Sequence, residues 1–332
     1  MKKGQVINGY KVLEDPRTAG MCMWSFARKD GNDYFIKQFL RPTYPLDDAP
    51  GSAATKERIR KDCEFFERRH RRILEVLKEK TGAGGNLIIT HQFFLHHTHY
   101  YKVTLRVNRS ELTPLDVSKL ELIEKLLVLI TVAHSLRTLH SVGIVHGDIK
   151  PDNILISRSD TGKNVGKLID FDDSYFAKEP PSPEEIVGDQ KYYSPELAQY
   201  IGESGEVERT DLQTASDIFA LGLVFSEYLT GKMPNFTPYP YAHEAAINGK
   251  KLILASSSLP VELKNLINQM LLSKYLERPT IESVFQLTRN LRSNLSDSAK
   301  NQTSVSREKA TSGRLHVSKD LEHLSRSKNM KH

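Results

Sequence analysis

The sequence has only two cysteines among its 332 residues, Cys22 and Cys63. Two thiols cannot supply the several cross-links on which small secreted domains depend, which argues against a disulfide scaffold and suits a reducing cytoplasm. Apolar runs long enough to span a bilayer are missing as well, and no apolar signal region follows the opening Met1-Lys2-Lys3-Gly4. We therefore expect a cytoplasmic protein with no membrane segment.

The sequence also has no excess of acidic residues. There are 47 Lys and Arg against 41 Asp and Glu, which gives a formal net charge of +6 and a pI near 9.0. A basic balance can indicate binding to nucleic acid or to anionic membranes. Much of the excess lies after Leu291 and on one long predicted helix, a distribution typical of a solvated surface. We expect no nucleic-acid partner.

The most informative stretch is a polar loop at 146–153, which lies between two apolar segments. Its Asp148 can accept a proton from an attacking hydroxyl, and Lys150 can neutralise charge on a phosphoryl group in transfer. Asn153 can offer an amide oxygen to a magnesium ion. Phosphoryl transfer needs mainly positioning and neutralisation of spread negative charge, so this loop favours phosphate chemistry.

A further carboxylate, Asp170, ends a short apolar strand after this loop and can hold the same metal. The loop contains the sequence Lys-Pro-Asp-Asn and resembles the catalytic loop of the Ser/Thr protein kinases. Asp170 resembles the metal-binding Asp of their DFG motif. The resemblance implies transfer of the γ-phosphoryl group of ATP to Ser or Thr hydroxyls of a protein substrate. Asp148 and Lys150 would be the catalytic residues, and Asn153 and Asp170 would hold Mg²⁺.

The first hundred residues alternate short apolar runs with turn signals, which predicts an antiparallel sheet of five strands. Lys37 lies inside one otherwise apolar strand, where an unpaired ammonium would be costly. One interpretation is a strand-edge lysine with its head group in water. The kinase resemblance implies instead that Lys37 holds the α and β phosphates of ATP. The strands are expected at 10–13, 23–27, 34–39, 86–94 and 99–107.

The resemblance is poor at the first turn, where kinases have a glycine-rich loop that approaches the phosphates. The three glycine positions of that motif fall on Arg17, Ala19 and Cys22. Gly20 stands at a neighbouring position and is the glycine we assign to nucleotide binding. Side chains at the other positions leave less room and less backbone freedom, so we expect weaker nucleotide binding or loop closure.

A long helix is predicted from Ala54 to Lys80, with a semi-polar face that includes His70. The resemblance implies that this helix brings a glutamate to Lys37. At 100° per residue, Glu67 lies on the flank of the face and Glu64 points well away from it. We therefore assign Glu67 to the pair with Lys37 and keep Glu64 as the reserve.

The last predicted strand, 99–107, runs into the segment that corresponds to the kinase hinge. The resemblance implies that Thr104 is the small residue beside the adenine pocket. It also implies that the backbone from Leu105 to Val107 hydrogen-bonds the base. These three residues complete the expected ATP site.

The second half of the sequence changes to helical periodicity, beginning with a long buried helix over 118–141. Three later motifs extend the resemblance, which covers residues 9–291. Glu196 follows Ser-Pro and resembles the end of an activation segment. Asp217, at the start of an apolar helix, would accept hydrogen bonds from the backbone of the catalytic loop. Arg278 would form a buried ion pair with Glu196.

Three departures from the family pattern have consequences. Gly147 replaces the Arg of the HRD motif, so a phosphorylated activation loop has no cation there, and we predict activity that is independent of such phosphorylation. Asp172 replaces the Gly of DFG and removes a flexible joint. Asp189 replaces a usual Thr, and we expect it to contact Lys150.

We expect an α+β, two-lobed fold: a first lobe at 1–107 with a five-stranded antiparallel sheet and one long helix, a mainly helical second lobe at 108–292, and a polar tail at 293–332. Two other functions are compatible with parts of the pattern. One is a small-molecule phosphotransferase of the aminoglycoside or choline type, which would lack the motifs around Glu196, Asp217 and Arg278. The other is a catalytically dead kinase-like scaffold, suggested by the eroded glycine loop.

Overall fold

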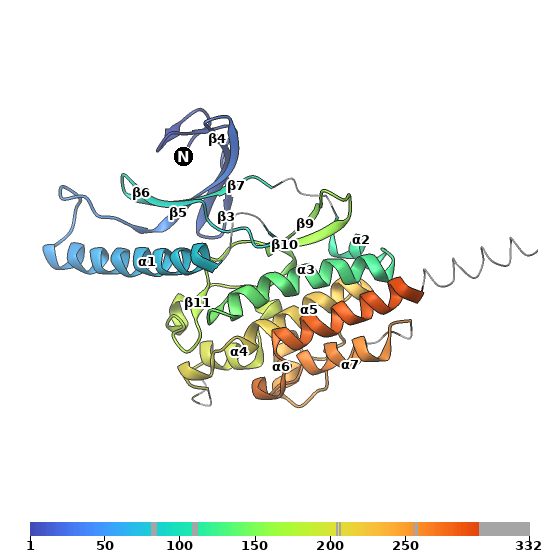
Figure 1. The fold of residues 1–332 in the computed structure, drawn as a ribbon. Helices are drawn as coiled ribbons and strands as arrows, with labels where there is room; N and C mark the ends of the chain where they lie inside the picture. Colours follow the sequence, from blue (N-terminus) through green and yellow to red (C-terminus); the bar gives the residue numbers. More distant parts are fainter. Residues whose placement is uncertain are drawn as a thin grey trace, which may run out of the picture.

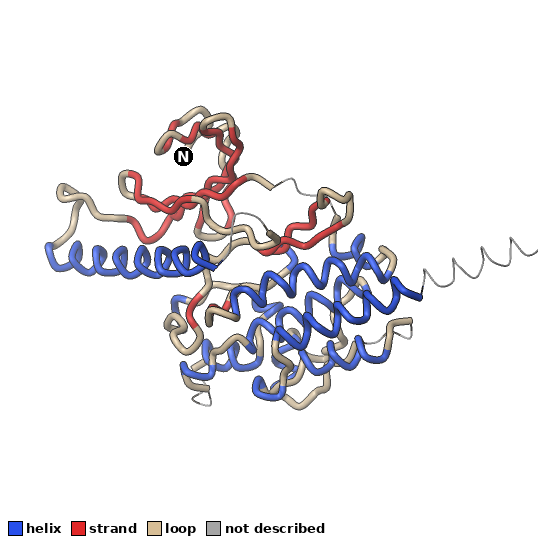
Figure 2. The backbone as a smooth tube through the Cα atoms, viewed as in Figure 1, coloured by secondary structure: helices blue, strands red, loops and turns tan. Residues whose placement is uncertain are grey.

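The computed structural model describes residues 1–80, 85–107, 112–203, 205, 207–254, 256 and 258–298. Strands from the first hundred residues form one curled sheet, and most helices gather below it in a second lobe (Figure 1). The separation of strand-rich and helix-rich halves is also clear in Figure 2. The α+β class and the two-lobed architecture are as expected.

The sheet of the first lobe is antiparallel and has seven strands rather than the five expected. The two additional strands, β1 and β3, are two and three residues long, which is too short to produce a period-2 pattern in the sequence. The strand order is β1-β2-β4-β5-β7-β6, and β3 pairs with β4. The bounds are β1 Val6–Ile7, β2 Tyr10–Val12, β3 Arg17–Ala19, β4 Cys22–Lys29, β5 Asn32–Thr43, β6 Gln92–His96 and β7 His99–Leu105.

One long helix, α1 (Ala53–Lys80), lies under the sheet, as the sequence predicts. It buries a narrow stripe of side chains, Cys63, His70, Ile73 and Leu77. Near its middle this stripe packs against an aromatic group on the strands, and near its end it joins the core of the second lobe. The helix therefore contacts both lobes. The aromatic group consists of Phe39, Phe93 and Tyr100.

The second lobe is built around α3 and α5, which are buried on most of their surface. The helix expected over 118–141 forms as α3 but begins later, at Leu122, because Ser118 ends a separate short helix, α2, which Thr113 caps. None of the helices in the described ranges has the length and apolar character needed to cross a membrane. The bounds are α2 Pro114–Ser118, α3 Leu122–His140, α4 Pro195–Ile201, α5 Ala215–Thr230, α6 Ala242–Ile247 and α7 Val261–Met270.

Two small hairpin-like sheets carry the polar loop and Asp170. Strand β8 (Ile144–Val145) pairs with β11 (Tyr175–Phe176), and β9 (Ile154–Arg158) pairs with β10 (Asn164–Leu168). The segment at 86–88 forms a parallel bridge with the end of β10 through the backbone of Leu168. The first lobe is therefore tied to the strand that leads directly into Asp170.

Residues 281–298, at the end of the described part of the chain, form a helix. Its Leu291 and Leu295 pack against the core of the second lobe. The boundary expected at 292/293 consequently falls inside this helix, and the remainder of the predicted tail lies outside the described residues, as do 108–111 at the expected lobe boundary.

Candidate active site

The loop that contains Asp148 is fixed by a buried carboxylate at the start of α5. Asp217 is 2% exposed and accepts hydrogen bonds from the backbone amides of His146 (2.8 Å) and Gly147 (3.1 Å). Nε2 of His140 lies 2.9 Å from the same carboxylate. One buried and one partly buried amide of the loop thereby gain a partner, which is the contact expected of Asp217.

His146 connects this loop to the segment that ends in Asp170. The Asp148 amide donates to Nδ1 of His146 at 3.3 Å, so Nε2 carries the proton and donates to the Ile169 carbonyl at 3.0 Å. Burial of the ring lowers the pKa of His146, and the nearby charge of Asp217 opposes that shift without reversing it. The imidazole is therefore neutral at pH 7 and acts as a fixed link between the two carboxylate-bearing segments.

The three polar side chains of the loop contact one another. Lys150 Nζ lies 2.7 Å from Asp148 Oδ2, and Asn153 Nδ2 donates to that same oxygen and to the Asp148 carbonyl, both at 2.8 Å. Burial would lower the pKa of Lys150, but its contact with Asp148 outweighs burial and raises it. Asp148 is thus held in one orientation by its two neighbours.

Gly147 has no room for a side chain. Its φ is +82°, and a Cβ built on it would lie 2.6 Å from the Asp173 carbonyl oxygen. The hydroxyl of Ser174 also donates to the His146 carbonyl at 2.9 Å. The loop and the segment after Asp170 are therefore in direct contact at the position where the family pattern has an Arg.

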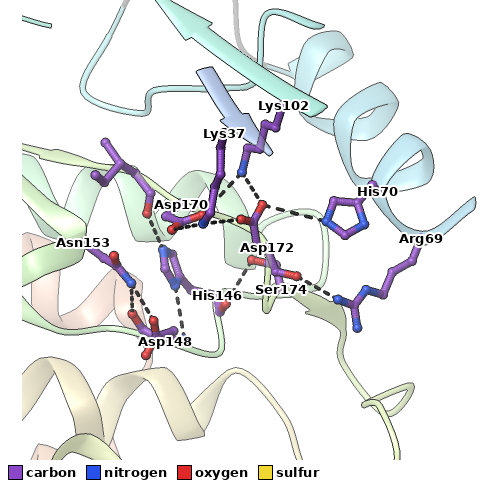
Figure 3. A network of polar contacts seen from close by, with 11 residues as sticks. Lys37, Arg69, His70, Lys102, His146, Asp148, Asn153, Asp170, Asp172 and Ser174 are labelled. Carbon is purple, nitrogen blue, oxygen red and sulfur yellow. Dashed lines mark hydrogen bonds and ion pairs between the residues drawn. The ribbon is translucent and has the colours of Figure 1, made fainter. Parts of the chain in front are cut away.

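Lys37, on β5, reaches Asp170 from the other lobe with an Nζ–Oδ2 distance of 2.8 Å (Figure 3). Asp170 has a φ of +61°, an uncommon conformation for a residue other than glycine. Lys37 Nζ also lies 2.5 Å from Asp172 Oδ2. The sequence prediction that Lys37, Asp148 and Asp170 converge on one region is compatible with this geometry.

A second lysine, Lys102 on β7, joins this group, although the sequence pattern did not lead us to expect it. Its Nζ lies 2.6 Å from Asp172 Oδ1 and 3.6 Å from Asp170 Oδ1. Lys102 is directly opposite Lys37 in the register of β5 and β7. The sequence does contain an indication that Lys102 belongs to this group. Lys102 interrupts the apolar strand Tyr100–Val103 in the same way that Lys37 interrupts its own strand.

The charges of this cluster stabilise one another. Burial would raise the pKa of Asp172, but Lys102 and Lys37 outweigh burial and hold it well below its ordinary value. Burial would likewise lower the pKa of Lys37, and the carboxylates of Asp172 and Asp170 instead raise it. The two lysines and the two carboxylates thus form one cluster of ion pairs that joins the sheet of the first lobe to the segment at Asp170.

The expected pair between Glu67 and Lys37 is not formed. Glu67 Oε1 lies 2.7 Å from Arg71 one turn further along α1, and its Oε2 accepts a hydrogen bond from Tyr100 at 3.2 Å. Glu64 is exposed. The prediction was wrong because the rotation of α1 places His70, not Glu67, toward the cluster, and Asp172 occupies the position beside Lys37.

The residues expected around ATP lie at the end of β7, just after it, and in the turn between β3 and β4. Gly20 and Met21 form the turn between β3 and β4, with a Gly20 φ of +54°. Thr104 lies two residues beyond Lys102, on the same face of β7. Leu105 is 54% exposed, and Val107 is partly buried. The assignment of these residues to the nucleotide stays a prediction.

Asp189 interacts with Lys150 differently from what we expected. Its side chain accepts a hydrogen bond from the Lys191 amide at 3.0 Å and so caps a short turn. It acts on Lys150 through its charge, as one of the acidic groups that raise the pKa of that lysine. Asp189 therefore caps its own turn, and no direct contact with Lys150 is found among the described residues.

Glu196 and Arg278 form the buried ion pair that the sequence suggested. Both guanidinium nitrogens Nη1 and Nη2 lie 2.7 Å from the carboxylate oxygens, and Ser216 donates to Glu196 at 2.8 Å. Arg278 donates further to the carbonyls of residues 215, 272 and 273. The pair is bidentate and fully hydrogen-bonded, which is the geometry in which a buried ion pair is stable.

Comparison with known proteins gives a consistent result. A family model described as the protein kinase domain matches residues 53–288. The chain is 31% identical over 186 residues to the ovarian-specific serine/threonine-protein kinase Lok of Drosophila melanogaster, which covers 54% of the chain and 36% of that protein. It is 29% identical over 143 residues to calcium-dependent protein kinase 31 of Arabidopsis thaliana, covering 42% of the chain and 27% of that protein.

A bacterial relative, the serine/threonine-protein kinase drp72 of Corynebacterium efficiens, is 36% identical over 104 residues, 31% of the chain and 18% of that protein. The aligned regions span less than two fifths of each of these relatives. The family match begins after β5, so it does not include Lys37. The contacts of Lys37 with Asp170 and Asp172 therefore add information that the family match does not contain.

Proposed function

Because the chain belongs to the protein kinase domain family, we propose that it is a Ser/Thr protein kinase that uses ATP and Mg²⁺. The observation that supports this most is the 2.8 Å ion pair between Lys37 and Asp170, which joins residues 133 positions apart in the sequence. It brings a cation from the first lobe to a carboxylate that lies beside the Asp148 loop. A phosphoryl-transfer site needs this combination of charges.

In the proposed reaction, Asp148 orients the substrate hydroxyl and accepts its proton. Lys150, 2.7 Å from Asp148, stabilises negative charge on the transferring phosphoryl group. Because Asn153 donates to both the carboxylate and the backbone carbonyl of Asp148, the carboxylate is oriented before a substrate arrives. Such pre-orientation lowers the barrier by avoiding reorganisation during the reaction.

Asn153 and Asp170 are suited to hold Mg²⁺, which supplies Lewis-acid neutralisation of phosphate charge when it is bound. Both offer oxygen ligands, which this ion prefers. The Asn153 Nδ2 group is used by Asp148, which leaves its amide oxygen for the metal. The Asp170 side chain is 33% exposed, and the Ile169 amide donates to the Asn153 carbonyl at 3.0 Å, so the two ligands come from adjoining segments.

Lys37 holds the α and β phosphates in this proposal, with Gly20 at the turn above them. Thr104, Leu105 and Val107 border the base. The choice of Ser and Thr in a protein as acceptors is supported by the Lys150-Pro151 sequence of the loop and by the names of the relatives, which are serine/threonine-protein kinases.

The proposal is tested with purified wild type, Asp170→Ala and the surface control Asp160→Ala, each with labelled ATP and Mg²⁺. Asp160 lies in the exposed turn between β9 and β10. We expect wild type and the control to transfer label to the protein itself or to a generic Ser/Thr substrate. Asp170→Ala should transfer none. Nucleotide binding without transfer to any acceptor would indicate a scaffold, and transfer only to a small alcohol would indicate a small-molecule phosphotransferase.

A further inference from the structure

We propose that Asp172 is the residue that positions Lys37 for the nucleotide, and that Lys102 holds Asp172 in place. This inference deepens the proposed kinase function and rests on it. It assigns to a carboxylate after Asp170 the role that the family resemblance led us to expect of a glutamate on α1. It also gives a role to a second buried lysine in the site.

The register of the sheet creates this arrangement. Lys37 and Lys102 are Cα partners on neighbouring antiparallel strands, so their side chains leave the same face of the sheet. Asp172 lies between the two ammonium groups, with Oδ2 2.5 Å from Lys37 and Oδ1 2.6 Å from Lys102 (Figure 3). Each carboxylate oxygen therefore has its own cation.

The buried surroundings of the two lysines make their ion pairs with Asp172 necessary. Lys102 is 6% and Asp172 is 9% exposed. Lys102 also lines a small pocket whose other walls include Ile73, Leu77 and Phe171. A lone ammonium is costly in such an apolar environment, and two unpaired ammonium groups side by side would also repel each other. Asp172 removes both penalties.

The two acidic residues differ in exposure, and this separates their roles. The side chain of Asp172 is 10% exposed, whereas that of Asp170 is 33% exposed. Asp172 is committed to the two lysines, while Asp170 faces the site and can exchange Lys37 for a metal. The positioning of Lys37 then does not depend on the carboxylate that is proposed to bind Mg²⁺.

Helix α1 acts on Lys37 through Asp172. Arg69 donates to the Asp172 carbonyl at 2.8 Å, and Nε2 of His70 lies 3.8 Å from the Asp172 carboxylate. Burial, opposed by Asp172, lowers the pKa of His70 to about 4, so the ring is neutral and is not a third cation. A shift of the helix would therefore move Asp172, even though Glu67 makes its own contacts elsewhere.

The first test identifies the partner of Lys37 without any activity measurement. Thermal unfolding midpoints are measured for two double-mutant cycles. The first pair is Lys37→Met with Asp172→Asn, and the second pair is Lys37→Met with Glu67→Gln; each cycle includes both single variants and the double variant. We expect the first pair of shifts to be non-additive by about 3 °C or more and the second pair to be additive. Additivity for Asp172 together with coupling for Glu67 would overturn the inference.

The second test measures kcat and KM for ATP in Asp172→Asn, Glu67→Gln and Lys102→Met/Asp172→Asn. Because Lys37 orients phosphates, its displacement in Asp172→Asn is expected to lower kcat at least tenfold with a smaller change in KM, whereas Glu67→Gln stays within twofold of wild type. If Asp172→Asn does not fold, the charge-balanced double variant carries the test. A wild-type kcat in either Asp172 variant contradicts the inference.

The two proposals fail in different ways. If wild type transfers no phosphoryl group but the unfolding midpoints follow the expected coupling, the kinase function fails and the ion-pair arrangement remains. If wild type is active but Asp172→Asn equals it, the positioning role fails and the kinase function remains.

Discussion

Replacing Gly147 by alanine tests whether the catalytic loop depends on its close approach to the neighbouring segment. Gly147 has a φ of +82°, and the methyl group of an alanine there would lie 2.6 Å from the Asp173 carbonyl oxygen. Gly143, four residues earlier, has a φ of +70° and nothing within 4 Å of the corresponding position. Gly143→Ala is therefore a control with similar backbone strain and no steric clash.

The expected loss in the free energy of unfolding has two contributions, the left-handed backbone and the steric clash. A left-handed backbone costs a residue other than glycine about 1–2 kcal/mol, partly offset by the lower entropy of the unfolded alanine chain. Overpacking against a fixed neighbour adds roughly 1–3 kcal/mol. We expect Gly143→Ala to lower the free energy of unfolding by about 1 kcal/mol and Gly147→Ala by about 2–4 kcal/mol.

Urea unfolding followed by far-ultraviolet circular dichroism measures both variants. A phosphotransfer assay should also show a kcat at least about tenfold lower for Gly147→Ala, because Asp148 is the next residue and shifts with the loop. If the two alanine variants lose equal stability and Gly147→Ala retains its kcat, the contact with Asp173 does not constrain this loop.

Three further perturbations have defined outcomes. Asp217→Asn leaves an amide group facing the His146 or Gly147 N–H, so urea unfolding should show a loss of about 1.5–3 kcal/mol; an unchanged free energy would refute the capping role. Burial and the charges of Asp172 and Asp148 raise the pKa of Asp173 to about 7. The unfolded carboxyl ionises first, so the contribution of Asp173 to wild-type stability should fall by at most about 4 kcal/mol as pH rises from about 4 to 7. The free energy of unfolding of wild type minus that of Asp173→Asn should therefore decrease over this range, and a difference that does not change with pH would contradict the raised pKa. Phosphatase treatment, or Ser and Tyr substitution within 173–194, should leave activity intact, and loss of activity in both experiments would contradict this.

The local part of the site could be predicted from the sequence. Asp148, Lys150 and Asn153 lie within one short loop, so their mutual contacts depend mainly on chain geometry. Asp217 and the pair of Glu196 with Arg278 lie in motifs whose order constrains the fold. These residues make contacts compatible with their expected roles.

The contacts between elements could not be predicted in the same way. Helical periodicity gives the buried stripe of α1 but not its rotation relative to the sheet, which is why Glu67 was assigned to Lys37 and His70 was not considered. The pairing of Lys37 with Lys102 depends on strand register, which a sequence without a tight hairpin between β5 and β7 does not fix. From the sequence, Asp172 was recognised only as the residue that replaces the Gly of DFG, because its contacts with the two lysines depend on that register.

The bidentate pair of Arg278 with Glu196 sets a lower limit on the length of a usable fragment. A truncated chain that ends before position 278 would keep Glu196 buried, at 3% exposure, without its cation. An uncompensated buried charge costs about 3–5 kcal/mol, a large share of the stability of a typical domain. Expression designs for the second lobe should therefore extend through this arginine, and protease fragments that lose it should not persist.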